Sequence, residues 1–170
     1  DGEIFITDTI TAETAKEFVQ QMRYLKKEDQ QKKVRIYINS PGGEVNAGLV
    51  IYDCLKLLES EVEIYCFGMA ASMAAIILAG GQKGRRYILP HSKIMIHEPL
   101  ISRGVGGSAT SIQRTAESIM ETKRLSVELL AADTGKSIEE IEKAISFDNY
   151  LNANEAIQFG ICDQIVKGIF

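Results

Sequence analysis

The chain carries, at residues 67–75, the stretch Phe67-Gly68-Met69-Ala70-Ala71-Ser72-Met73-Ala74-Ala75. The β-branched and aromatic run before it, residues 62–67, predicts a buried strand that ends at Gly68. The small and apolar run after it, residues 73–79, predicts a helix that stops at Gly80-Gly81. Ser72 therefore lies where a strand gives way to a helix.

Small residues on both sides of Ser72 leave its hydroxyl uncrowded. This is the setting of a nucleophile elbow, in which an exposed serine lies close to free backbone N–H groups. The alternative is that Ser72 only caps the helix. The local sequence leaves both interpretations open, because Ala70 and Ala74 stand where the elbow motif has glycines.

The first half of the chain alternates strands and helices. Residues 4–6 and 34–38 predict strands, and two amphipathic helices follow them. Strand, helix, strand, helix, strand and helix in this order predict an α/β domain with a parallel sheet and crossover helices. Ligands gather at the carboxyl ends of such strands, where Ser72 and the turn Asn39-Ser40-Pro41-Gly42-Gly43 both fall. The apolar face of the first helix consists of Ala15, Phe18, Val19 and Met22, and that of the second consists of Val45, Leu49, Tyr52 and Leu55.

The second half of the chain predicts strands at 87–89 and 93–96, around the turn Pro90-His91-Ser92. A helical pattern then runs from about 109 to 132, roughly 36 Å at 1.5 Å per residue. Because this length rivals the diameter of a 170-residue domain, we expect the helix to project and to pack on another subunit. Two capping boxes, at residues 137–140 (Ser137 to Glu140) and 152–155 (Asn152 to Glu155), predict the starts of two short helices. A last strand is expected at 162–166.

Composition is that of one ordinary soluble domain spanning 1–170, with 45% hydrophobic and 25% charged residues. A net charge of −4 gives no general attraction to nucleic acid or to an anionic membrane, and no run approaches the ~18 apolar residues of a membrane span. Cys54, Cys66 and Cys162 are odd in number and form no C-x-x-C motif, so neither a disulfide framework nor a zinc site is indicated. We expect buried thiols and a reducing, cytoplasmic location.

A serine nucleophile needs a base, and the only histidines are His91 and His97. His91 lies in a predicted turn, which favours an exposed loop position. His97 ends a predicted apolar strand, at a sheet edge where function is common, although a partly buried structural histidine is the alternative.

The acid that orients the base must lie before Ser72 or after His97, since no Asp or Glu occurs between them. This excludes the α/β-hydrolase order of serine, acid and histidine. Asp148 has apolar neighbours, a setting in which an aspartate needs a partner. Of the other acids, Asp133 looks like a helix-end residue and Asp163 lies in a predicted strand. The residues alone leave the choice open.

These residues, in this order and spacing, resemble the proteolytic subunit of the Clp protease (the ClpP family). The resemblance covers essentially the whole chain. It is carried by Ile38-Asn39-Ser40-Pro41-Gly42-Gly43, Gly68-Met69-Ala70-Ala71-Ser72-Met73-Ala74, Met95-Ile96-His97-Glu98-Pro99-Leu100, Asp148 and Phe159-Gly160-Ile161-Cys162-Asp163. It implies a ClpP/crotonase-like α/β fold of repeated strand–helix units, with the long helix near 109–132 as a projecting handle.

The resemblance also implies the site. Ser72 would be the nucleophile, His97 the general base and Asp148 the orienting acid, while the backbone N–H groups of Gly43 and Met73 would form the oxyanion hole.

Substrate would lie extended as an added strand, against the backbone near Glu44 and Val45 on one side and Leu100 on the other.

For assembly, the resemblance implies two stacked heptameric rings, a tetradecamer that encloses a chamber. An AAA+ unfoldase would feed it unfolded polypeptide and use the ATP, so this chain is expected to need no cofactor and no metal.

The chain departs from the family pattern at Ala74, at Ile101-Ser102 and at Phe147, where glycine, a glycine pair and arginine are usual. These departures keep a second hypothesis open, a weakly active or structural paralogue in a mixed ring. A remote third is a crotonase-type acyl-CoA enzyme, in which paired N–H groups act on a thioester without a serine nucleophile.

Overall fold

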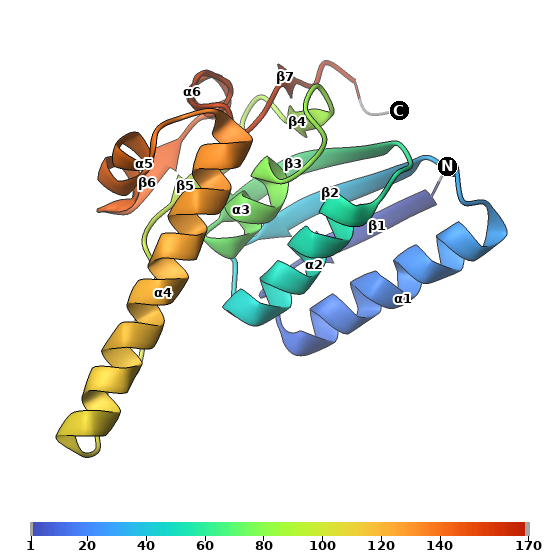
Figure 1. Cartoon of the computed structure of the whole chain (residues 1–170). Coiled ribbons are helices and arrows are strands. Elements are labelled where there is room, and N and C mark those ends of the chain that lie inside the picture. The colour runs from blue at the N-terminus through green and yellow to red at the C-terminus, as the bar shows by residue number, and fades with distance from the viewer. Residues whose placement is uncertain (1, 169–170) are drawn as a thin grey trace.

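A computed structural model describes residues 2–168, in which seven strands form one sheet and six helices pack against one face and one end of it (Figure 1). The central strand is β3 (Val62–Ala71). Five strands run parallel in the order β1-β2-β3-β4-β7, which confirms the parallel sheet predicted from the sequence. The other four are β1 (Gly2–Thr7), β2 (Val34–Ser40), β4 (Arg86–Ile88) and β7 (Gln164–Ile165).

Strand β3 has two partners on one side, one after the other. Its first half pairs with β4, and its last three residues, Met69 to Ala71, pair in parallel with β5 (Lys93–Ile96). The prediction that this strand ends at Gly68 is therefore wrong. Gly68, at φ +109°, lies where the pairing with β2 shifts register, and the strand resumes beyond it because β5 offers a new partner.

Three helices cover one face of the sheet, α1 (Ala12–Glu28), α2 (Val45–Leu57) and α3 (Met73–Ala79) (Figure 1). Their apolar faces bury side chains such as Phe18, Met22 and Ile51 against the isoleucines of the strands. Each helix crosses over between parallel strands, as the order of elements predicts.

The opposite face of the sheet carries a row of stacked aromatic rings. Strand alternation turns Ile4 and Ile6 into the core and Phe5 outward. Ring centroids along the row lie 4.9, 5.2 and 4.8 Å apart, in the order Phe5, Tyr37, Tyr65 and Tyr87. Such contacts between neighbouring strands stabilise their register.

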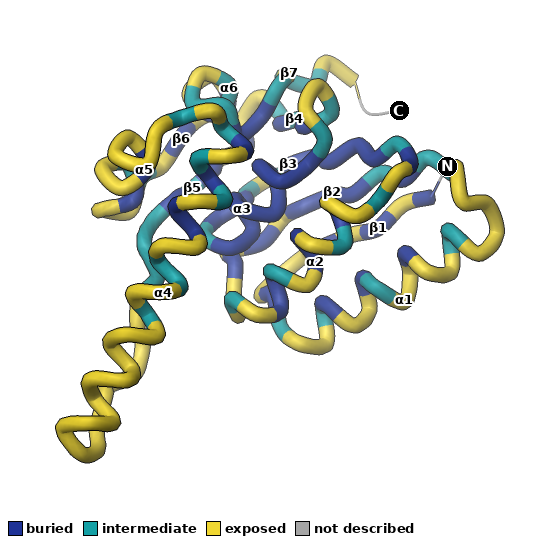
Figure 2. The backbone as a smooth tube through the Cα atoms, viewed as in Figure 1, coloured by how far each residue is buried: buried dark blue, intermediate teal, exposed yellow. Residues whose placement is uncertain are grey.

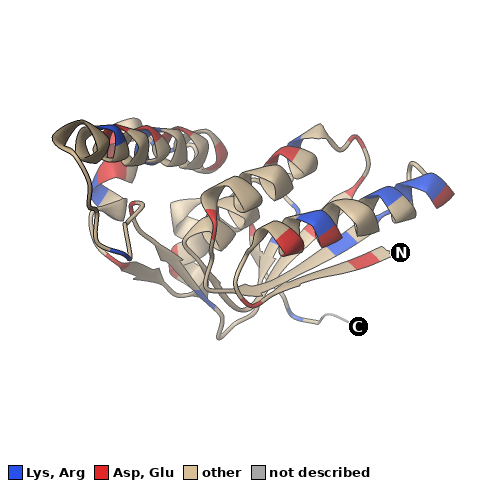
Figure 3. Ribbon diagram, turned by 90° about the horizontal axis from the view of Figure 1, so that it is seen from below, with Lys and Arg blue, Asp and Glu red and all other residues tan. Residues whose placement is uncertain are grey.

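Helix α4 (Ala109–Thr134) projects from the body of the molecule, as predicted (Figure 1). Its buried residues all lie in the C-terminal third, at Ser126, Val127, Leu130 and Asp133, and its N-terminal half is exposed (Figure 2). Charges of both signs are spread along it (Figure 3). A helix that leaves this much of its length unpacked has surface to offer a partner.

The C-terminal elements follow their predicted capping boxes. Helices α5 (Ile138–Ile145) and α6 (Ala153–Phe159) are capped by Ser137 and Asn152, with both hydrogen bonds of each box formed. The last strand is shorter than predicted. Asp163 precedes it and binds the guanidinium of Arg86, whose Nη1 also donates to the carbonyls of Ala79 and Asp133. This buried arginine connects β4 to the ends of α3 and α4.

All three cysteines are free. Cys66 and Cys162 are buried as predicted, and burial raises the pKa of Cys66 to about 12, so its thiol stays protonated. Cys54 is only half-buried, so the prediction is wrong for that residue. None of the helices within residues 2–168 has the length and apolar character needed to cross a membrane.

Candidate active site

Ser72 lies between β3 and α3 in an unusual backbone conformation, with φ 56° and ψ −124°. Its N–H donates to the Met95 carbonyl at 2.8 Å, which ties the turn to β5. Every residue of α3 is buried, so the far side of the turn is fixed as well. The serine occupies the N-cap position, but its hydroxyl contacts a histidine instead of capping the helix.

The structure brings Ser72, His97 and Asp148 together. The Nε2 atom of His97 lies 2.9 Å from Ser72 Oγ, and its Nδ1 atom lies 3.1 Å from Asp148 Oδ1. Since β3 and β5 are parallel neighbours, their ends place Ser72 beside His97 at one rim of the sheet. The His97 side chain is 15% exposed and that of Asp148 is 65% exposed.

Strand β6 (Asn149–Leu151), which the sequence did not predict, places the aspartate. It pairs antiparallel with β5, and Asn149 lies opposite Ile96, so the preceding residue, Asp148, reaches His97. The apolar setting predicted for Asp148 is wrong. Phe147 and Tyr150 are 58% and 61% exposed, because this short strand lies at the margin of the sheet with solvent on its outer side.

The other candidate groups are engaged elsewhere. Asp133 accepts hydrogen bonds from Tyr52 and Lys56, and Asp163 binds Arg86. His91 is exposed in the turn between β4 and β5, as predicted. Of the acids considered in the sequence, Asp148 is the one that contacts a histidine.

The turn at Gly42 and Gly43 lies against the serine. A Cβ atom on Gly42 would come within 2.8 Å of Ser72 Cβ, and one on Gly43 would overlap the Ile10 carbonyl. Glycine is therefore required at both positions for steric reasons. Among the described residues, nothing accepts a hydrogen bond from the backbone N–H of Gly43 or of Met73.

Two features that the sequence did not reveal hold this turn. Ile10 forms a one-residue parallel bridge with it, through hydrogen bonds of 2.8 Å to the Gly42 carbonyl and 2.9 Å from the Glu44 N–H. The buried hydroxyl of Ser40 accepts from the Gly42 N–H at 3.1 Å and donates to the Asp8 carbonyl. Ile10 belongs to a strand–helix linker without any pattern, so no sequence signal marks it.

A groove of about 440 Å³ lies between the start of α2, the segment after His97 and α4. Two of the predicted substrate-binding residues, Val45 and Leu100, line it. Glu44 does not: it lines the groove between α1 and α2, and its N–H already donates to the Ile10 carbonyl. The groove is lined by Val45, Pro99, Leu100, Ile101, Arg114, Thr115, Ser118, Ile119 and Thr122.

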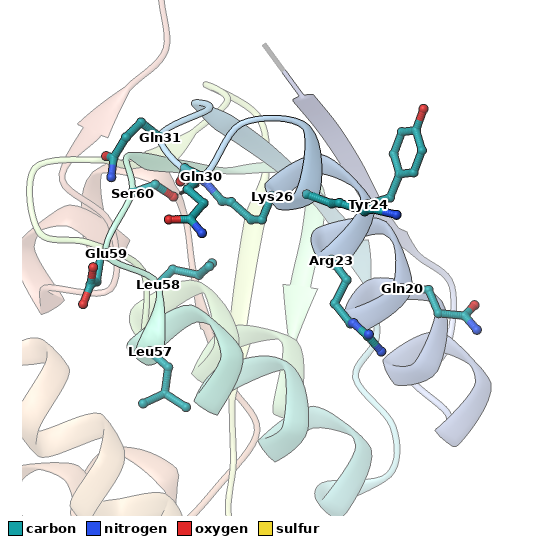
Figure 4. Close-up of a pocket in the computed structure, with 11 residues that line it drawn as sticks. Gln20, Arg23, Tyr24, Lys26, Gln30, Gln31, Leu57, Leu58, Glu59 and Ser60 are labelled. Carbon is teal, nitrogen blue, oxygen red and sulfur yellow. Dashed lines mark hydrogen bonds between the residues drawn. The ribbon is translucent and has the colours of Figure 1, made fainter.

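A second cavity, of about 680 Å³, lies between the C-terminal ends of α1 and α2 (Figure 4). Ser60 lines it just before β3 begins, whereas Ser72 follows the end of β3, so the two lie at opposite ends of a ten-residue strand. Lys26 lines the cavity and donates to Ser60 and to the Lys32 carbonyl. The cavity contains none of the predicted site residues.

Within residues 2–168, no group of three or more His, Cys, Asp and Glu side chains could hold a metal ion.

The fold is a mixed α/β architecture of the ClpP type, with a serine, a histidine and an aspartate at one rim of a parallel sheet. The family model described as Clp protease matches residues 1–168. The chain belongs to the Clp protease family, which makes it a ClpP-like peptidase.

Proposed function

We propose that this chain is a serine endopeptidase, the proteolytic subunit of an ATP-dependent Clp protease. The observation that carries the proposal is the continuous contact from Ser72 Oγ through the His97 ring to Asp148, at 2.9 and 3.1 Å. These are hydrogen-bond distances for a nucleophile, a base and an orienting acid.

In the proposed reaction, Ser72 Oγ attacks the scissile carbonyl while His97 Nε2 takes the hydroxyl proton. Collapse of the tetrahedral intermediate breaks the C–N bond, and His97 returns that proton to the leaving amine. Water then hydrolyses the acyl-enzyme with His97 again acting as base. Asp148 accepts from Nδ1–H throughout, which keeps Nε2 free for the proton transfers.

The negative oxygen of the intermediate would be bound by the backbone N–H groups of Gly43 and Met73. Support comes from their lack of acceptors among the described residues and from the fixed turn that carries Gly43. Donors that are already in place need no reorganisation when the charge develops.

Substrate would be unfolded polypeptide, bound extended along Val45 and Leu100, the two predicted residues that line the groove. The chemistry uses side chains and backbone alone, so we propose that this chain itself needs no metal, ATP or other cofactor. ATP would be used by an AAA+ unfoldase partner, and the location would be cytoplasmic.

For assembly we propose two stacked seven-membered rings of single-domain subunits. Helix α4 would pack between them, since its projecting part exposes Ile112, Met120 and Leu125. Apolar side chains on a projecting helix gain stability when a second copy covers them.

The test is hydrolysis of a fluorogenic peptide by the assembled protein. We expect Ser72→Ala to lower kcat by about 10⁴-fold or more, and Ser146→Ala, an exposed serine on α5's C-cap, to leave it unchanged. Absence of hydrolysis by the native chain, or activity that survives Ser72→Ala, would contradict the proposal.

A weakly active paralogue in a mixed ring is the second candidate, favoured by Phe147 and by the high exposure of Asp148. Two results together would support this candidate. The chain would co-purify with a second subunit, and the activity of the mixed ring would not change when Ser72→Ala is introduced in this chain. The match to the Clp protease family gives no support to an acyl-CoA enzyme.

A further inference from the structure

The groove between α2, α4 and the segment after His97 contains one charged side chain, that of Arg114. Apolar groups form much of its wall, with contributions from Val45, Leu100 and Ile119, and its remaining polar groups are neutral hydroxyls. Of the described residues that line it, none is Asp or Glu. A side chain that enters this groove therefore meets apolar surface and a positive charge.

Within the described residues, no acid neutralises the Arg114 charge. Arg114 is exposed on α4, and none of the described residues forms a salt bridge with it. The nearest acids along the helix and loop have other contacts: Glu117 accepts from Gln113, and Glu98 binds Lys123 at 2.7 Å. The guanidinium thus differs from Lys123, whose charge is already paired within the chain.

The groove is formed in part by the two segments that carry Gly43 and His97. Val45 and Pro99 both line the groove. Val45 lies two residues after Gly43, and Pro99 lies two residues after His97. Because two residues span at most about 7 Å, a peptide whose scissile carbonyl lay between Ser72 and the Gly43 N–H would have the side chain of that same residue within reach of the groove.

We propose that Arg114 gives this peptidase a preference for substrates with an acidic side chain, glutamate above all, on the residue that supplies the scissile carbonyl. The inference rests on the proposed function. The two methylenes of glutamate would pack on the apolar wall, and its carboxylate would meet the guanidinium, whose planar fork matches a carboxylate. Lysine at the same position would be repelled.

The experiment uses three peptides that differ only in the residue before an aminocoumarin leaving group, which is glutamate, leucine or lysine. For the native chain we expect kcat/KM to favour glutamate over lysine by about fivefold at low salt, and less at high salt. Arg114→Glu should reverse the order and Arg114→Gln should abolish the preference. Because both substrates are compared on one enzyme sample, the ratio does not depend on how much of it is assembled.

The matched control is Arg23→Glu, the same change of charge on an exposed arginine of α1 that lines the cavity at the other end of β3. It should keep the native ratio. If the leucine peptide is cleaved but Arg114→Glu keeps the native ratio of glutamate to lysine, the Arg114 inference is overturned and the peptidase proposal stands. If none of the three peptides is cleaved, the peptidase proposal itself fails.

Discussion

The backbone of Ser72, at φ 56° and ψ −124°, is in a region that glycine occupies easily and other residues do not. We expect Ser72→Gly to be more stable than Ser72→Ala by about 1 kcal/mol, because both variants lose the hydroxyl and only glycine relieves the strain. Denaturant unfolding of the two variants measures the difference. An alanine variant as stable as the glycine variant would show that the turn stores no strain.

Ser40 is the second residue with a specific expected effect. Its buried hydroxyl connects the Gly42 N–H to the Asp8 carbonyl, so Ser40→Ala should loosen the turn that presents the Gly43 N–H. We expect kcat to fall about tenfold with KM nearly unchanged, since an oxyanion donor acts mainly in the transition state.

Steady-state kinetics with the leucine peptide checks this prediction. The control is Ser126→Ala, another buried serine, whose hydroxyl donates to the Thr122 carbonyl within α4. A rise in KM without loss of kcat in Ser40→Ala would assign Ser40 to substrate binding instead.

How far the sequence revealed the site differs from residue to residue. Ser72 and His97 were candidates from local pattern, because each follows an apolar run predicted as a strand, but their roles stayed open until the family resemblance was added. Asp148 depended on the family resemblance, since the strand that places it has only three residues. Ile10 was not predicted, because a single bridge between distant segments leaves no local pattern.

Among the elements, β3 shows why boundaries are harder to predict than element types. The sequence predicts a strand correctly but ends it at Gly68, four residues before the hydroxyl it presents. Glycine is a sound local signal for a strand end. Pairing with β5, which lies more than twenty residues later in the chain, overrides that signal.

The ion pair between Arg86 on β4 and Asp163, just before β7, predicts that the free energy of unfolding depends on pH. Burial opposes ionisation of Asp163, but hydrogen bonds from the Arg86 side chain and from backbone N–H groups outweigh it, so the pKa of Asp163 lies below its ordinary value. A carboxylate with a lowered pKa in the folded state stabilises the fold above its unfolded pKa and loses that contribution as pH falls through the folded one.

We therefore expect Asp163→Asn to cost about 3 kcal/mol in free energy of unfolding at pH 7, because it leaves a buried guanidinium without its anion. The difference from the native chain should shrink as the pH is lowered from about 5 toward 3. Denaturant titrations at several pH values measure it. A difference that stays constant over this range would show that the carboxylate charge does not stabilise the fold.

For the molecule as a whole, the sequence sufficed to predict a parallel α/β sheet and a projecting helix. Both follow from repeated patterns: alternating strand and helix segments, and a helical run too long for the domain. Apolar periodicity does not indicate which strand pairs with which, so the separate pairing of β4 and β5 with the two halves of β3 was not predicted.

The projecting helix predicts the effect of one substitution on assembly. Met120 is 58% exposed on α4, so Met120→Asp should place a charge in the proposed contact between rings. We expect the particle mass to fall by about half or more, while Met120→Leu keeps it, because burying an unpaired charge costs several kcal/mol. Sedimentation measures the mass. A native particle of one 18.8 kDa chain would contradict the proposed assembly.

The most direct test of the account is labelling by a serine-reactive phosphonate, with the modified residue mapped by mass spectrometry. The geometry at the rim of the sheet predicts rapid modification of Ser72 in the native chain and loss of that reactivity in His97→Ala, since Nε2 lies 2.9 Å from Oγ. Modification of a different residue, or equally rapid modification of Ser72 without His97, would contradict it.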